Sequence, residues 1–126
     1  MLKILLADDY PDTTNTLSKV LQAWGHDCEI AYDGPGALKL AADCRPDVAL
    51  LDIGMPGMDG YAVARQLLTM HPGLPIYAAT GYGRLIDVIK SKEAGFTGHL
   101  LKPVDLTRLR QILASIEMSL HEPCGV

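Results

Sequence analysis

The sequence of 126 residues lacks several features that mark common protein classes. No apolar run approaches the roughly 20 residues needed to span a bilayer. The first residues, Met1 to Ile4, lack the basic region and the long apolar segment of a secretion signal. The net charge is −4 and there is no basic run, which argues against direct binding of nucleic acid. We therefore expect a cytoplasmic protein without membrane insertion.

Cysteine is scarce, and its spacing is uninformative. Cys28, Cys44 and Cys124 are odd in number and form no CxxC pair, so we expect reduced thiols rather than disulfides or zinc ligands. The glycines between residues 54 and 60 do not form the GxxxxGK[ST] pattern of a phosphate-binding loop. We expect these glycines to permit a tight turn after the third predicted strand.

Short apolar runs alternate with amphipathic segments five times along the chain. The predicted strands are Lys3–Ala7, Glu29–Tyr32, Val48–Leu51, Ile76–Thr80 and His99–Leu101. The first and third are nearly all apolar, as expected for central strands covered on both faces, whereas the second alternates and should lie at an edge.

The segments between these strands carry helix signals. The predicted helix starts are Asp12 or Thr13, Gly34-Pro35, Asp59-Gly60, about Arg84, and Asp105. The residues predicted to face the core are Leu17, Val20, Leu21, Trp24, Ala37, Leu38, Ala41, Val63, Leu67, Met70, Leu106, Leu109, Ile112, Leu113 and Ile116. Helices joined to strands by short loops predict a parallel sheet in a three-layer α/β sandwich, with one domain over 1–121 and a frayed tail over 122–126.

Charged residues stand where the predicted strands end. Asp8 and Asp9 follow the first strand, Asp52 follows the third, and Lys102 follows the fifth. In a parallel sheet these ends share one edge, so three carboxylates and an ammonium should meet there. Open α/β sheets place their chemistry at this edge.

Four motifs in this order resemble a known family. They are Leu5-Leu6-Ala7-Asp8-Asp9, the stretch from Leu51 to Gly60, Ala79-Thr80-Gly81, and Leu101-Lys102-Pro103. The chain resembles a response-regulator receiver domain over nearly its whole length. The resemblance implies a flavodoxin-like (βα)5 fold with a five-stranded parallel sheet in the order 2-1-3-4-5, which is taken from the family and not from this sequence. Residues 79–83 and 99–105 are more similar to receivers of hybrid sensor kinases than to those of DNA-binding regulators.

The resemblance implies a phosphorylation-dependent signalling switch. Asp52 would accept a phosphoryl group from a histidine kinase or a histidine phosphotransfer domain, forming an acyl phosphate. Clustered carboxylates repel both one another and the phosphoryl group, so the site needs a divalent cation. As the resemblance implies, Asp9, Asp52 and the Gly54 carbonyl would bind Mg²⁺, with Asp8 acting through a water and Mn²⁺ as a possible substitute.

The remaining family positions concern phosphoryl binding and switching. The resemblance implies that Lys102 contacts a phosphoryl oxygen, that Pro103 follows it in a usually cis bond, and that the Thr80 hydroxyl is the switch group. His99 stands where the family usually has an aromatic residue; it has either a switching role or none. Tyr82 either covers the site and slows hydrolysis or contacts a partner.

The resemblance also implies partner surfaces, and the motifs leave rival functions to compare. The donor should dock over the first predicted helix and its neighbouring loops, and a downstream protein should meet a face that includes Ile86, Lys90, His99 and Arg108. We do not expect an ordinary enzyme, because any transfer or hydrolysis belongs to the switch cycle. The alternatives are a flavodoxin-like cofactor binder, a phosphohydrolase with an aspartyl nucleophile, and a degenerate receiver that only binds partners. The acidic loop after the first strand disfavours the first, and Gly54 in place of a second acid disfavours the second.

Overall fold

A computed structural model of the chain describes residues 1–55, 59–80, 92–101 and 104–121. Its elements are β1 (Lys3–Ala7), α1 (Pro11–Ala23), β2 (Asp27–Ala31), α2 (Gly34–Asp43), β3 (Val48–Asp52), α3 (Gly60–Met70), β4 (Ile76–Thr80), β5 (Gly98–Leu101) and α5 (Leu106–His121). The fourth predicted helix falls mostly outside the described residues. Its end is described, and Gly95 closes it with a φ of 94°, as Gly25 closes α1 with a φ of 89°.

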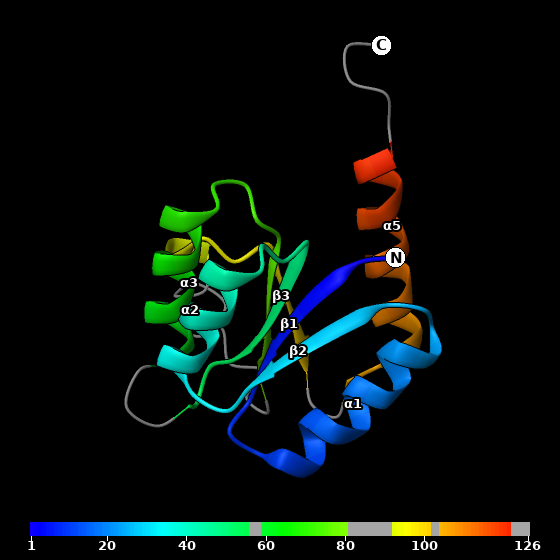
Figure 1. Cartoon of the computed structure of the whole chain (residues 1–126), viewed down its shortest axis with the longest axis horizontal. Helices are drawn as coiled ribbons and strands as arrows, with labels where there is room; N and C mark the ends of the chain where they lie inside the picture. Colours follow the sequence, from blue (N-terminus) through cyan, green and yellow to red (C-terminus); the bar gives the residue numbers. More distant parts are fainter. Residues whose placement is uncertain (56–58, 81–91, 102–103, 122–126) are drawn as a thin grey trace.

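The strands form one parallel sheet in the order β2-β1-β3-β4-β5. Figure 1 shows α2 and α3 on one face of this sheet and α1 and α5 on the other. The predicted fold class and strand order are therefore confirmed, with β2 at an edge. Within the described residues, no helix combines the length and apolar character needed to cross a membrane.

Alternation along the strands divides the core into two clusters. In β1, Leu5 and Ala7 join the cluster under α2 and α3, whereas Ile4 and Leu6 join the cluster under α1 and α5. The neighbouring strand β3 repeats this pattern, because Leu6 pairs with Leu50 and Ala7 with Leu51. Fixed register brings the ends of β1 and β3 to the same level.

Helix starts show where local sequence decides structure. Asp59 caps α3 by accepting the N–H of Ala62 at 2.9 Å, and Asp105 accepts from Thr107 at 3.0 Å, both as predicted. The cap predicted at Asp12 or Thr13 is wrong. Helix α1 already begins at Pro11, whose fixed φ suits a first helical position, with Tyr10 as a cap that makes no side-chain bond.

Two residues predicted to face the core are exposed instead. Met70 is 37 % exposed and Leu106 is 42 % exposed. Met70 is the last residue of α3 and Leu106 the first of α5, and at a helix end the helical face no longer lies over the sheet. Three strand boundaries differ from the prediction by one or two residues: β2 spans Asp27–Ala31 rather than Glu29–Tyr32, β3 extends to Asp52, and β5 begins at Gly98.

Candidate functional site

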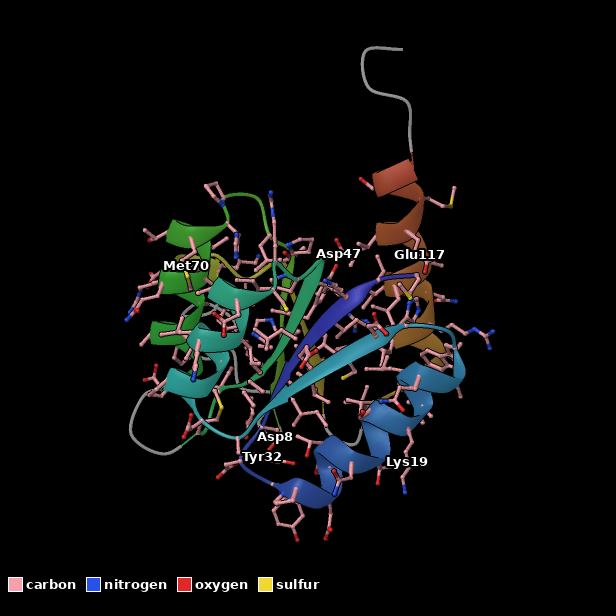
Figure 2. All side chains as sticks on the ribbon, viewed as in Figure 1. Asp8, Lys19, Tyr32, Asp47, Met70 and Glu117 are labelled. Atoms are coloured by element: carbon pink, nitrogen blue, oxygen red, sulfur yellow. The ribbon has the colours of Figure 1, made fainter. Side chains whose placement is uncertain are left out.

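Three carboxylates gather at the carboxyl edge of the sheet. Asp8 and Asp9 follow β1, and Asp52 is the last residue of the adjacent β3. One carboxylate oxygen from each lies within 4.8 Å of the others. Asp8 is only 3 % exposed, Asp52 is half-buried and Asp9 is exposed. Figure 2 shows Asp8 at this edge, close to Tyr32 at the end of β2.

Backbone groups orient two of these carboxylates. The Asp8 side chain accepts the N–H of Tyr10 at 3.0 Å, and the N–H of Asp8 donates to the carbonyl of Ala31 at 3.1 Å, which ties the loop to the end of β2. In β3, Asp52 Oδ1 accepts the N–H of Gly54 at 3.2 Å. Local turns thus fix where the carboxylates lie.

Helix α3 begins against the backbone of the same site. The N–H of Gly60 donates to the carbonyl of Ile53 at 3.2 Å. A Cβ at residue 60 would lie 2.8 Å from the Asp52 carbonyl oxygen and 2.9 Å from Ile53 Cα. Only glycine permits this approach without a shift of backbone. From the sequence, Asp59-Gly60 is predicted only as a helix start, because no local signal distinguishes a helix start from this close approach of backbones.

The donor set suits a small, hard cation. Three carboxylates at this spacing offer oxygen ligands of the kind that Mg²⁺ prefers, and a partly exposed site leaves room for the waters that this ion keeps. The residues present therefore fit the predicted metal. The Gly54 backbone is exposed beside Asp52, while its role as a ligand stays a prediction.

Several predicted site residues cannot be placed. Lys102, Pro103 and Tyr82 lie outside the described residues, as do Ile86 and Lys90 of the predicted output face. Thr80 ends β4 as predicted, although its side chain is not described. His99 is half-buried on β5, in register with Ala78 of β4.

Two histidines outside the acidic site are partly buried and bonded. The His26 side chain is 9 % exposed and its Nδ1 accepts the N–H of Leu2. His71 Nε2 lies 2.7 Å from the carbonyl oxygen of Ala41. His26 follows the turn that closes α1, and His71 directly follows α3. Each contacts a part of the chain that is distant in sequence, which residue spacing alone does not reveal.

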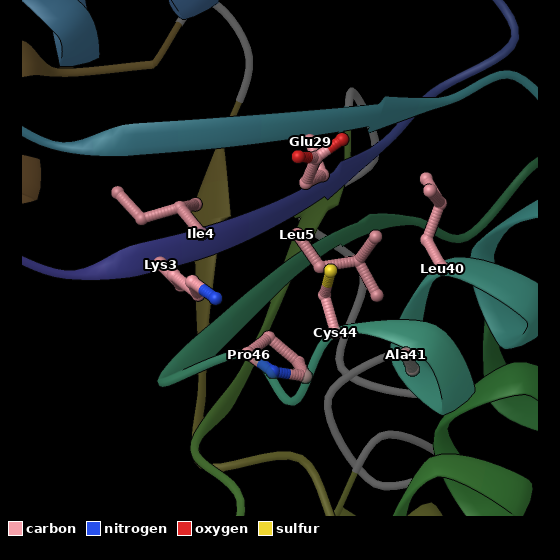
Figure 3. A pocket seen from close by; sticks show the side chains of 8 residues that line it. All are labelled: Lys3, Ile4, Leu5, Glu29, Leu40, Ala41, Cys44 and Pro46. Carbon is pink, nitrogen blue, oxygen red and sulfur yellow. The ribbon is translucent and has the colours of Figure 1, made fainter.

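Two cavities differ in size and place. A groove of about 630 Å³ runs between α1 and the start of α5, with an apolar floor from Leu17, Val20, Val104 and Leu106. Figure 3 shows the other, beneath α2, with Cys44 among its lining residues. Its volume of about 10 Å³ is close to that of one water, so it offers no space for an organic cofactor.

Comparisons with known proteins point to one family. The model of the response regulator receiver domain matches residues 4–114. The chain is 33 % identical over 108 residues to sporulation initiation phosphotransferase F of Bacillus subtilis, covering 86 % of this chain and 87 % of that protein. It is 33 % identical over 113 residues to sensor histidine kinase RcsC of Salmonella typhi, covering 90 % of this chain and 12 % of the kinase.

A regulator and a solved structure extend the comparison. The chain is 30 % identical over 112 residues to transcriptional regulatory protein ZraR of Salmonella typhimurium, covering 89 % of this chain but only 25 % of that protein. The crystal structure of chemotaxis protein CheY4 of Vibrio cholerae superposes with a TM-score of 0.87 at 30 % identity, covering 92 % and 98 % of the two chains.

Proposed function

Since the chain belongs to the family of response regulator receiver domains, we propose that it is a phosphorylation-dependent switch with Asp52 as the phosphoacceptor. Receiver domains take their phosphoryl group from histidine kinases or phosphotransferases and act as signalling phosphoacceptors rather than as ordinary enzymes. The observation that carries the assignment of Asp52 is the gathering of its carboxylate with those of Asp8 and Asp9 at the end of the central strand.

The proposed reaction moves one phosphoryl group between two side chains. An oxygen of Asp52 attacks the phosphorus of a phosphohistidine, the P–N bond breaks, and the imidazole of the donor leaves with the bonding pair and takes up a proton. The Gly54 N–H, which donates to Asp52 Oδ1, orients the attacking carboxylate. Hydrolysis of the resulting acyl phosphate would reset the switch.

The proposed metal ligands are Asp9, Asp52 and the Gly54 carbonyl, with Asp8 acting through a water. When bound, Mg²⁺ or Mn²⁺ would offset the repulsion between these carboxylates and the oxygens of the incoming phosphoryl group. In this structure the Tyr10 N–H holds the side chain of Asp8 and the Ala31 carbonyl holds its backbone.

The phosphoryl oxygens would be bound by Lys102, which lies outside the described residues, and by Thr80, the last residue of β4. We assign the Lys102 ammonium to one oxygen and the Thr80 hydroxyl to another, with Pro103 directing the lysine inward. The order of motifs along the chain supports these roles. His99, on the strand next to Thr80, would respond when that hydroxyl moves.

Tyr82 would limit access of water to the acyl phosphate. Tyr82→Ala should then shorten the lifetime of the phosphorylated protein, as measured by the decay of the phosphorylated mass after the donor is removed. An unchanged lifetime would assign Tyr82 to partner contact instead.

The phosphohistidine donor would dock over α1 beside the acidic edge. The groove between α1 and α5 supports this placement, since its apolar floor of Leu17, Val20 and Val104 offers contact area within reach of the site. We propose that residues 1–121 form the receiver domain, that 122–126 are a tail, and that the domain works in the cytoplasm with a downstream protein partner.

The test uses a small phosphodonor in place of the kinase. The protein is incubated with Mg²⁺ and acetyl phosphate, and intact mass is measured for the wild type, Asp52→Asn and the control Asp43→Asn, whose exposed carboxylate ends α2. Wild type and control should gain one phosphoryl group that EDTA prevents, and Asp52→Asn should gain none. A wild type that stays unmodified would favour the degenerate receiver, and modification of Asp52→Asn would reject the assignment.

A further inference from the structure

A second polar cluster lies at the end of the sheet opposite to the three aspartates. Here α5 passes the start of β1, and Figure 2 shows Glu117 at this end, far from Asp8. His26, in the turn between α1 and β2, places its Nδ1 3.1 Å from the backbone nitrogen of Leu2 and 3.3 Å from Glu117 Oε1. The ring therefore touches both the sheet and α5.

One ring nitrogen faces two partners that need opposite protonation states. To accept the N–H of Leu2, Nδ1 must carry a lone pair, as in neutral His26 with its proton on Nε2. To donate to Glu117 the same nitrogen must carry a proton, and the Leu2 N–H then loses this acceptor. Losing a partner at fully buried Leu2 is unfavourable, while a bond between imidazolium and carboxylate is strong. The two arrangements therefore oppose each other. The Leu2 N–H selects the neutral tautomer with its proton on Nε2, whereas the imidazolium carries a proton on both nitrogens and can only donate to Glu117.

Other charged groups surround this cluster. The α-amino group of Met1 lies 3.3 Å from the same oxygen of Glu117 and can share that carboxylate. Asp27 is exposed at the start of β2. Arg110, also on α5, lies over the indole ring at the end of α1. His121, one turn beyond Glu117, has a side chain outside the described residues and must be tested separately.

We propose that His26 is a proton-controlled clip between α5 and the start of the sheet. Neutral His26 holds β1 through the Leu2 N–H; protonated His26 gives up that bond and holds α5 through Glu117. Acidification that protonates the ring would therefore tighten α5 and loosen the start of β1. The clip needs neither metal nor phosphoryl group and goes beyond the proposed switch.

Amide hydrogen exchange of the whole chain tests the clip without metal or phosphodonor. Protection of the α5 amides near Glu117 should rise about two- to fivefold from pH 7.5 to 5.5, after correction for intrinsic exchange rates. This fold-change corresponds to the free energy of a partly exposed ion pair. Protection of the Leu2 amide should fall over the same interval. These opposite changes distinguish the clip from a general effect of pH on stability.

Variants assign the response to particular side chains. His26→Gln should abolish both changes, whereas Glu117→Gln should abolish only the change in α5 and keep that at Leu2. His121→Gln and His71→Gln should keep both. Loss of the response in His121→Gln, or its survival in His26→Gln, would overturn the proposal, as would a wild type without opposite changes. If His26→Gln does not fold, Glu117→Gln still decides, because this partly exposed helix position tolerates glutamine.

Discussion

The two faces of the sheet are packed with side chains of different size. Among the residues that the structure describes, half of the buried ones in the cluster under α2 and α3 are alanines, whereas the cluster under α1 and α5 has none and is mostly leucine. Small side chains let a helix approach the sheet closely, and large ones hold it further away. We infer from this difference in side-chain size that α2 and α3 pack on a thinner apolar layer than α1 and α5 do.

Both layers reach the acidic site, because α1 begins just after Tyr10, which bonds Asp8, and α3 begins beside Asp52. Gly60 begins α3 directly against the backbone of Asp52 and Ile53, on the alanine-rich face. The close contact between Gly60 and the backbone of Asp52 therefore helps to position the Asp52 carboxylate. On the leucine-rich side the contacts with α5 are broader and include the polar cluster at His26.

The largest effect should come from a cavity in the leucine-rich layer. Leu113 is almost fully buried on α5, so Leu113→Ala should lower the free energy of unfolding by about 2–5 kcal/mol. Urea denaturation measures the change, with Ser115→Ala on the exposed face of α5 as the control. A loss close to that of the control would mean that this layer collapses around the cavity, and the contrast between the faces would be weaker than we infer.

Overpacking the alanine-rich layer should have the next largest effect. Ala64 is fully buried on α3, and Ala64→Leu should destabilise the fold by about 1–3 kcal/mol because neighbouring groups must move. Gln66→Leu, at an exposed position of the same helix, is the matched control in the same denaturation assay. A stable Ala64→Leu protein would show that α3 has space to move away from the sheet.

Gly60→Ala tests whether close packing controls the site. The added Cβ would press on the backbone of Asp52, so we expect a loss of about 1–2 kcal/mol in stability and slower modification by acetyl phosphate, followed by intact mass. The stability control is Gly54→Ala, whose Cβ would lie 3.9 Å from Asp52 Oδ1, an ordinary contact. Unchanged stability and rate in Gly60→Ala would separate the packing of α3 from the chemistry.

The smallest effect concerns a thiol on the leucine-rich face. Burial raises the pKa of Cys28 above its ordinary value, and the Glu29 charge adds to this, although a bond with Ser18 opposes it. The unfolded chain then ionises this thiol first, so its contribution to stability is present below the ordinary thiol pKa and is lost as pH rises above it. With Cys44 and Cys124 changed to serine, labelling of Cys28 should require a higher pH in native than in denatured protein; equal pH profiles would contradict the shift.

The strands and the acidic edge could be predicted because their signals are local. Apolar runs that end in Asp8 and Asp52 fix both the strand and the position of its carboxylate, and a parallel sheet then gathers those ends. The close approach at Gly60 and the buried state of His26 could not be predicted in this way. Their partners are brought together only by the register of strands and the docking of helices.

The start of α1 and the burial of Met70 were predicted incorrectly for a related reason. Asp12 has the chemistry of a cap, but Pro11 already supplies a suitable φ one residue earlier. Met70 has the spacing of a core residue, but it is the last residue of α3 and its side chain is exposed. Periodicity predicts which face of a helix a residue lies on. It does not predict how far the sheet beneath that face extends along the helix.

The alanine-rich face also limits how this domain can be altered. Leucine, isoleucine and methionine exchange at modest cost on the opposite face, but alanines packed under α2 and α3 have no larger substitute that fits. In a library of random variants, selection should therefore retain diversity along α1 and α5 and remove it along α2 and α3. Engineers who wish to attach new specificity to this scaffold would begin with the thicker layer.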